Sequence, residues 1–144
     1  MERPEILLPV AVLVAWSILM MLWMVIARFG AMRARGISLR GVVGGRPGML
    51  DGVIEERAQW KAHNYIHLME QPTLFYAIAL TLAVAGEGDG VNALIAWAYV
   101  ALRVLHSLIQ ATVNVVLYRF LVFMLASLAL IALTLHALMA LIGR

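Results

Sequence analysis

A polar stripe opens one of the most apolar segments of this chain. His63, His67 and Glu70 are spaced i, i+4 and i+7, so a helix would place their side chains on one face. Imidazole and carboxylate groups are nitrogen and oxygen ligands for zinc or iron, and two histidines one helical turn apart are compatible with chelation. A metal site is therefore one interpretation of this stripe.

A second polar stripe lies farther along the chain. It contains Arg103, His106, Gln110 and Asn114, spaced i, i+3, i+7 and i+11. Two such stripes on membrane helices are expected to face each other, because lipid cannot satisfy their hydrogen-bonding groups. We expect Glu70 and Arg103 to form an ion pair, since each charge alone would be costly inside a membrane. Hydrogen bonding between helices would by itself account for these residues, without any ligand.

The composition shows what must position these stripes. Of the 144 residues, 64% are hydrophobic and 13% are charged, whereas a soluble domain has about 45–50% apolar and about 25% charged residues. This apolar surface is too large to hide in a soluble domain, and the composition predicts an all-α integral membrane protein. The chain has no cysteine, which excludes disulfides, thiolate metal sites and a cysteine nucleophile.

Four apolar segments are long enough to cross a membrane as helices. They cover roughly residues 6–27, 62–85, 91–117 and 120–142. These segments predict a single domain, a four-transmembrane-helix bundle. Pro72 leaves the carbonyl of Leu68 without its helical partner, so the second span is expected to bend there. Tyr118 and Arg119 leave almost no loop before the last span, which predicts either a tight helical hairpin or one bent helix.

The distribution of charge predicts the orientation in the membrane. Residues 28–61 form a basic link with six arginines and Lys61, whereas residues 86–90, GEGDG, are acidic. Because basic loops stay in the cytoplasm, we expect the link and Arg119 to be cytoplasmic and both termini to lie outside. This describes a multi-pass protein of a bacterial inner membrane. Topology and anionic lipid head groups account for the basic link, so no nucleic-acid partner is expected.

Several motifs, taken in order, resemble the MAPEG family, the membrane-associated proteins in eicosanoid and glutathione metabolism, and are most similar to its bacterial branch. The matching residues are Glu70-Gln71-Pro72-Thr73-Leu74-Phe75, Ala96-Trp97, Arg103-Val104-Leu105-His106-Ser107 and Arg119-Phe120. The resemblance covers the whole chain, with four spans, a long first loop and short later ones. It implies a homotrimer of four-helix bundles, with a glutathione site between neighbouring subunits that is open toward the cytoplasmic side.

The resemblance also implies roles for individual residues. Glu70 would bind the amino group of glutathione. Arg119 would be the catalytic residue that favours the thiolate, because a nearby arginine lowers the pKa of a thiol. The other ligand-binding candidates are His67, His63, Arg103, His106 and Gln110.

The chain departs from the glutathione-metabolising members of that family at several positions. Those members have asparagine and arginine where this chain has His67 and His63, and they have tyrosine where it has Gln110. Phe120 stands where the prostaglandin E synthases have serine. Several direct ligands of glutathione are thus replaced, so the resemblance implies the fold more strongly than it implies glutathione chemistry.

Three functions fit these residues. One is a glutathione-dependent transferase or peroxidase that acts on a lipophilic electrophile. Another is a non-catalytic membrane trimer that binds a lipid or a partner, which the replaced ligands favour. The third is a metal site built from the histidines and Glu70. The expected partners are membrane lipids, further copies of the chain and a lipophilic small molecule.

Overall fold

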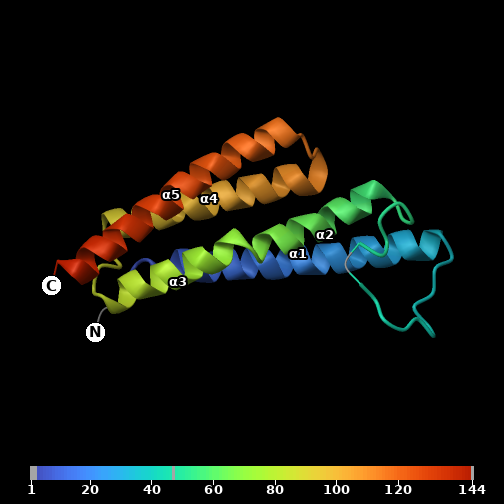
Figure 1. Ribbon diagram of the computed structural model, residues 1–144, viewed down its shortest axis with the longest axis horizontal. Coiled ribbons are helices and arrows are strands. Elements are labelled where there is room, and N and C mark those ends of the chain that lie inside the picture. Colours follow the sequence, from blue (N-terminus) through green and yellow to red (C-terminus); the bar gives the residue numbers. More distant parts are fainter. Residues whose placement is uncertain (1–2, 47, 144) are drawn as a thin grey trace.

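Five α-helices make up the folded part of the chain (Figure 1). The computed structural model describes residues 3–46 and 48–143, and this part contains no strand. The helices are α1 (Leu7–Ala34), α2 (Glu56–Leu68), α3 (Gln71–Val84), α4 (Val91–Thr112) and α5 (Val116–Ile142). The chain is therefore all-α, as its composition predicts.

Three of these helices, α1, α4 and α5, are long and apolar enough to cross a membrane. α1 has 28 residues, which corresponds to about 42 Å at about 1.5 Å per residue. It is longer than a hydrocarbon core of about 30 Å, so its last turns project beyond the core. Large apolar side chains such as Ile26 and Leu94 point outward, as they do in a protein whose solvent is lipid. The chain is an integral membrane protein.

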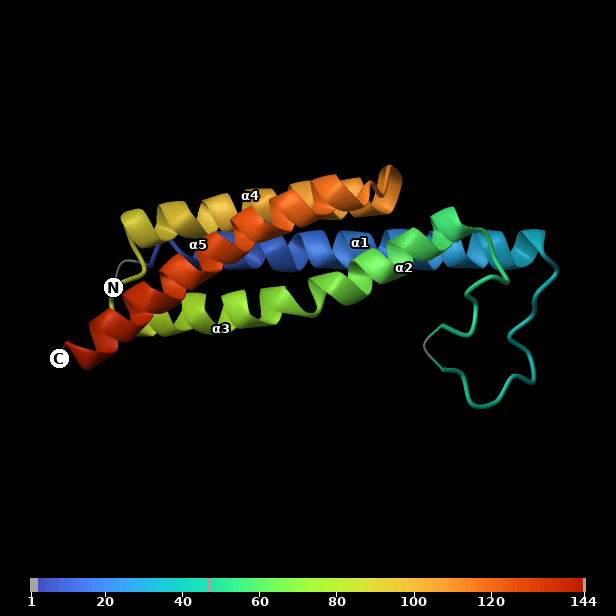
Figure 2. The same cartoon turned by 45° about the horizontal axis from the view of Figure 1, so that its top comes forward.

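The second predicted span is divided into two helices that lie end to end alongside α1 (Figure 2). α2 ends at Leu68 and α3 begins at Gln71, with Pro72 in its first turn. The proline cannot donate to the Leu68 carbonyl, so the break falls where the sequence places it. At the start of α3, the hydroxyl and the backbone N–H of Thr73 both donate to the carbonyl of Glu70.

A tight hairpin joins α4 to α5, and of the two predicted forms the structure has this one. α4 ends at Thr112, and Asn114 has a left-handed backbone with φ of 52°. An L-residue at this φ interrupts a right-handed helix, and asparagine is among the residues that tolerate it. The turn therefore lies earlier than predicted, and Arg119 belongs to the first turn of α5 instead of the junction.

The two ends of the molecule contain different segments of the chain. At one end, the N–H of Ile6 donates to the Gly88 carbonyl at 2.9 Å, and the N–H of Glu5 donates to Asp89 at 2.7 Å. These bonds attach the N-terminal segment to the acidic turn, and the C-terminus lies at the same end (Figure 1). The basic link lies at the opposite end, toward which the α4–α5 hairpin also points.

The helices pack around a core of aromatic and small side chains. The rings of Phe75 and Tyr99 stack with centroids 4.4 Å apart. Alanines of α3, α4 and α5 (Ala79, Ala96 and Ala126) are fully buried in the same core. Small residues at such positions let membrane helices approach closely, so this core holds the polar residues of α2, α4 and α5 at fixed distances.

Candidate functional site

A small pocket lies where the end of α2, the second half of α4 and the start of α5 meet. It has a volume of about 200 Å³. Its lining consists of His67, His106, Val116, Arg119, Phe120 and Phe123. The structure thus brings together three of the predicted site residues, His67, His106 and Arg119, from three different helices.

Aromatic contacts hold the two histidines of the pocket. The imidazole of His67 lies 5.0 Å from that of His106 and stacks on the ring of Phe123 at 5.7 Å, measured between centroids. His106 is buried, with 2% of its surface exposed. The two imidazoles are therefore fixed by packing, and neither sequence spacing nor the resemblance pointed to Phe123.

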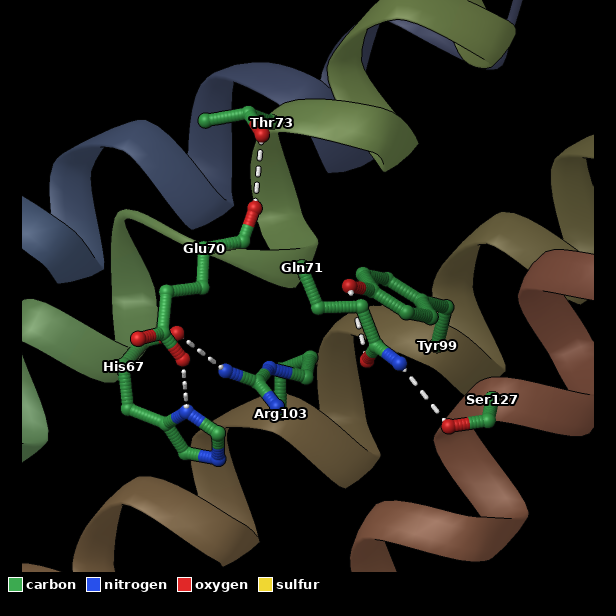
Figure 3. A network of polar contacts seen from close by, with 7 residues as sticks. All are labelled: His67, Glu70, Gln71, Thr73, Tyr99, Arg103 and Ser127. Atoms are coloured by element: carbon green, nitrogen blue, oxygen red, sulfur yellow. Dashed lines mark hydrogen bonds and ion pairs between the residues drawn. The ribbon is translucent and has the colours of Figure 1, made fainter.

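Glu70 lies in the break between α2 and α3, and its side chain points toward His67, one of the residues that line the pocket (Figure 3). Its carboxylate is 2.6 Å from Nδ1 of His67. The break replaces the continuous helical face on which the sequence placed His63, His67 and Glu70. The Glu70 side chain is 61% exposed, so it remains accessible to a ligand while it orients the imidazole.

Arg103 is fully buried on α4, with no exposed surface. Its Nη2 donates to the backbone carbonyl of His67 at 3.0 Å (Figure 3). The ion pair expected between Glu70 and Arg103 is absent among the described residues, where the pairs within 4.0 Å join His67 to Glu70 and His63 to Asp51. The guanidinium instead lies at the C-terminal end of α2, where carbonyl groups lack helical donors and a cation is favourable.

Arg119 extends from the first turn of α5 to the rim of the pocket. Its Nη1 donates to the side-chain oxygen of Asn114 at 2.6 Å. Its Nε is buried and has no hydrogen-bond partner among the described residues. A buried donor without a partner is costly in a folded protein. Arg119 therefore lies at the pocket with one N–H that no described residue satisfies.

A further polar network lies behind Glu70, and sequence reasoning missed it. The hydroxyl of Tyr99 donates to Gln71 at 3.3 Å, and the amide of Gln71 donates to Ser127 at 2.8 Å (Figure 3). The network links α3, α4 and α5. Its residues are polar positions within apolar segments, and such groups need hydrogen-bond partners inside the bundle. This was the signal in the sequence that could have indicated the network.

Four predicted site residues do not line the pocket: Glu70 and Arg103, which contact His67, and also Gln110 and His63. Gln110 is buried on α4, and its Oε1 has no partner among the described residues. His63 is half exposed and lies 3.8 Å from Asp51 of the basic link. It lines a separate pocket of about 480 Å³ with Arg28 and Arg46. One helical turn thus separates two environments that the spacing of His63 and His67 assigned to one stripe.

Asn64 is a buried polar residue of α2, although it lies near the start of the second predicted span. Only 1% of its surface is exposed. Its amide donates to the hydroxyl of Ser107 at 2.8 Å and joins α2 to α4. α2 starts at Glu56, well before the predicted span, so Asn64 lies inside the helix and faces its neighbour instead of the membrane surface.

The described residues contain no group of three or more histidine, aspartate or glutamate side chains that could hold a metal ion. His63 lies with Asp51, while His67 lies with Glu70 and His106. The chelating set that the sequence offers is therefore divided between two places, and the geometry gives the metal interpretation no support.

Comparison with known proteins gives one finding for the chain as a whole. The model of the MAPEG family matches residues 6–139, which include all of the site described above. Neither the curated proteins nor the solved structures give a significant match. The family match extends over nearly the whole chain.

Proposed function

Because this chain belongs to the MAPEG family, a family of membrane proteins of glutathione and eicosanoid metabolism, we propose that it is a glutathione-dependent membrane enzyme. Its reaction would conjugate glutathione to a lipophilic electrophile or reduce a lipid peroxide. One observation carries the proposal. The guanidinium of Arg119 lies at a pocket with two imidazoles and has a buried N–H without a partner among the described residues.

The donor set of this pocket suits an anion. A thiol with a pKa of about 8.5 is only a few per cent ionised at neutral pH. A guanidinium beside it favours the thiolate, the form that attacks an electrophile. The exposed carboxylate of Glu70 lies beside His67, which lines the pocket. An ammonium group of a ligand in the pocket could therefore bind to this carboxylate. Arg119 is therefore the residue proposed to act on the sulfur, with Glu70, His67 and His106 as binding residues.

The size of the pocket supports a site completed by a second subunit. About 200 Å³ is less than the roughly 300–1,000 Å³ that encloses most small ligands. The pocket also opens between exposed apolar side chains of α5, among them Val116 and Phe120. We propose that the chain forms a homotrimer in which a neighbouring subunit covers this face and completes the glutathione site.

The proposed orientation places this site at the cytoplasmic end of the bundle. The pocket lies at the α4–α5 hairpin, toward the end that carries the basic link (Figure 1). The acidic turn and the C-terminus lie at the other end. The positive-inside rule then puts the pocket beside the cytoplasm, where glutathione is abundant. In a bacterium this membrane would be the inner one.

A second candidate function is lipid binding without catalysis. The carboxylate of Glu70, which would receive the ammonium group of glutathione, already contacts His67 at 2.6 Å. Two phenylalanines, Phe120 and Phe123, line the pocket beside Arg119. An arginine next to aromatic rings at a membrane-facing pocket also suits a fatty acid, whose carboxylate would pair with the guanidinium.

Glutathione binding decides between these functions. Calorimetry on the purified protein in detergent would measure affinity, and the ultraviolet absorbance of the thiolate would measure ionisation. The variants are Arg119→Lys and, as a matched control, Arg40→Lys in the exposed link. We expect the wild type and Arg40→Lys to bind alike. Arg119→Lys is expected to bind at least about tenfold more weakly, because lysine lacks the planar fork of donors.

Two results would contradict the proposal in different ways. No binding of glutathione by the wild type at millimolar concentration would leave lipid binding as the function. Equal binding and equal thiolate absorbance in all three proteins would make Arg119 a topology anchor, since lysine keeps the positive charge.

A further inference from the structure

We propose that Asn114 is a positioning residue that holds the Arg119 guanidinium at the mouth of the pocket. The inference rests on the proposed function in one respect, that the ligand bound by Arg119 is glutathione. Asn114 does not line the pocket, and its side-chain oxygen accepts a hydrogen bond from Arg119, which does line it. Its role is therefore separable from that of the binding residues.

The backbone at Asn114 fixes where its side chain starts. Its φ of 52° is the single positive value among the described residues other than glycine. Its N–H donates to the carbonyl of Ile109 at 2.7 Å, which closes the last turn of α4. Asparagine accepts this conformation with little strain, whereas most residues with a β-carbon do not. The same residue thus ends α4 and presents an amide oxygen to the start of α5.

The side chain of Asn114 then restrains Arg119. An arginine side chain has several freely rotating bonds, and immobilising it costs conformational entropy. The bond of 2.6 Å from Nη1 to the Asn114 oxygen compensates part of this cost before any ligand binds. An amide oxygen does so without neutralising the guanidinium, whereas a carboxylate in its place would compete with an anionic ligand.

Asn114 is thus expected to hold the Arg119 guanidinium in place while leaving its positive charge intact. Loss of its side chain would leave Arg119 in place on α5 but free to rotate. The affinity for glutathione would fall, and the thiol of the bound ligand would ionise less readily. A purely structural role in the hairpin would leave that ionisation unchanged.

A double-mutant cycle tests the contact without glutathione. The variants are Asn114→Gly, Arg119→Met and the pair, and the measurement is the midpoint of thermal unfolding in detergent. Glycine accepts the positive φ, so this substitution removes the side chain without straining the turn. We expect Asn114→Gly to lower the midpoint in the wild-type background and to change it little beside Arg119→Met. An equal loss in both backgrounds would overturn the contact.

Glutathione then tests the consequence. Asn114→Gly is expected to bind up to about tenfold more weakly, because Arg119 would then be immobilised only when the ligand binds. Its bound thiol should also need a higher pH to ionise. Asn114→Asp should keep the coupling in the cycle, since it retains the oxygen, while its charge raises the thiol pKa. Unchanged affinity and ionisation in Asn114→Gly would refute the positioning role.

The two failures can be told apart. If the wild type binds no glutathione, the proposed function falls, and the cycle still decides whether Asn114 holds Arg119. If the wild type binds glutathione and the cycle shows no coupling, the proposed function stands and the assignment of Asn114 is wrong.

Discussion

Arg103 shows how one residue can serve the site without touching a ligand. It is fully buried, and its one side-chain hydrogen bond among the described residues goes to the His67 carbonyl. Where α2 stops, carbonyl groups of the last turn lose their helical donors. A guanidinium placed there supplies a donor and a favourable charge. The cation therefore stabilises the break that turns His67 and Glu70 toward the pocket.

This geometry predicts unequal effects for two substitutions. Glu70→Gln should change the free energy of unfolding by no more than about 1 kcal/mol, because its exposed pair with His67 is screened by solvent. Arg103→Gln should cost about 1–3 kcal/mol, because a buried carbonyl loses its donor. Reversible unfolding in mixed micelles would measure both.

The effects of these two substitutions distinguish a Glu70–Arg103 ion pair from the separate contacts that each side chain makes with His67. A direct ion pair between Glu70 and Arg103 requires comparable losses and recovery in the double variant. The structure instead predicts that Arg103→Gln is the more destabilising change and that Glu70→Gln beside it recovers none of the loss. Recovery of stability in the double variant would restore the ion pair and contradict the contacts seen around Arg103.

At the scale of the helices, the sequence predicts some helix boundaries and misses others. The third predicted span starts at Val91, as α4 does, and Pro72 marks the break between α2 and α3. The end of α4 was missed, because Val113 and Val115 continue the apolar run on both sides of Asn114. Hydropathy detects length and polarity, whereas a left-handed residue is a backbone property that asparagine tolerates but does not require.

The same limit explains what was missed at the site. Residue type and spacing identified His67 and His106 as candidates, and the resemblance to the MAPEG family added Arg119. The structure places all three around one pocket. Their spacing also grouped His63 with His67, although the two line different pockets. Both histidines lie on α2, before the break, and periodicity does not show that each meets a different neighbour one turn apart, Asp51 for His63 and His106 for His67. The pairing of Arg103 with a backbone carbonyl has no trace in the sequence, since every residue carries that group.

For the whole molecule, the uneven charge predicts which end faces the cytoplasm. The acidic turn lies with the N-terminal segment at one end, and the basic link lies at the other. A single cysteine can report each end, because the chain itself has none. We expect Glu87→Cys to be labelled by an impermeant maleimide added outside intact cells. Gly45→Cys should be labelled only after the cells are opened.

The positions for this test follow from the packing. A β-carbon at Gly88 would lie 2.7 Å from Pro4, so a cysteine there would disturb the turn that it reports. A β-carbon at Gly45 would meet no atom within 4 Å, and its backbone is not left-handed, while Glu87 is exposed. Labelling of Gly45→Cys but not of Glu87→Cys in intact cells would reverse the topology and place the pocket outside.

Assembly is the remaining property at this scale. A single subunit offers a pocket of about 200 Å³, and large apolar side chains cover the outer faces of α1, α4 and α5. Lipid covers some of these faces, and we propose that neighbouring subunits cover others. The site residues then lie close to a boundary between subunits, so assembly and glutathione binding are expected to depend on each other.

Native mass spectrometry of the purified protein with glutathione tests this central claim most directly, because it reports subunit number and bound ligand in one spectrum. The account predicts a trimer that carries glutathione, with Arg119→Lys forming the same trimer and retaining much less of it. A wild-type trimer without glutathione, or glutathione bound to a monomer, would contradict a glutathione site completed by a neighbouring subunit.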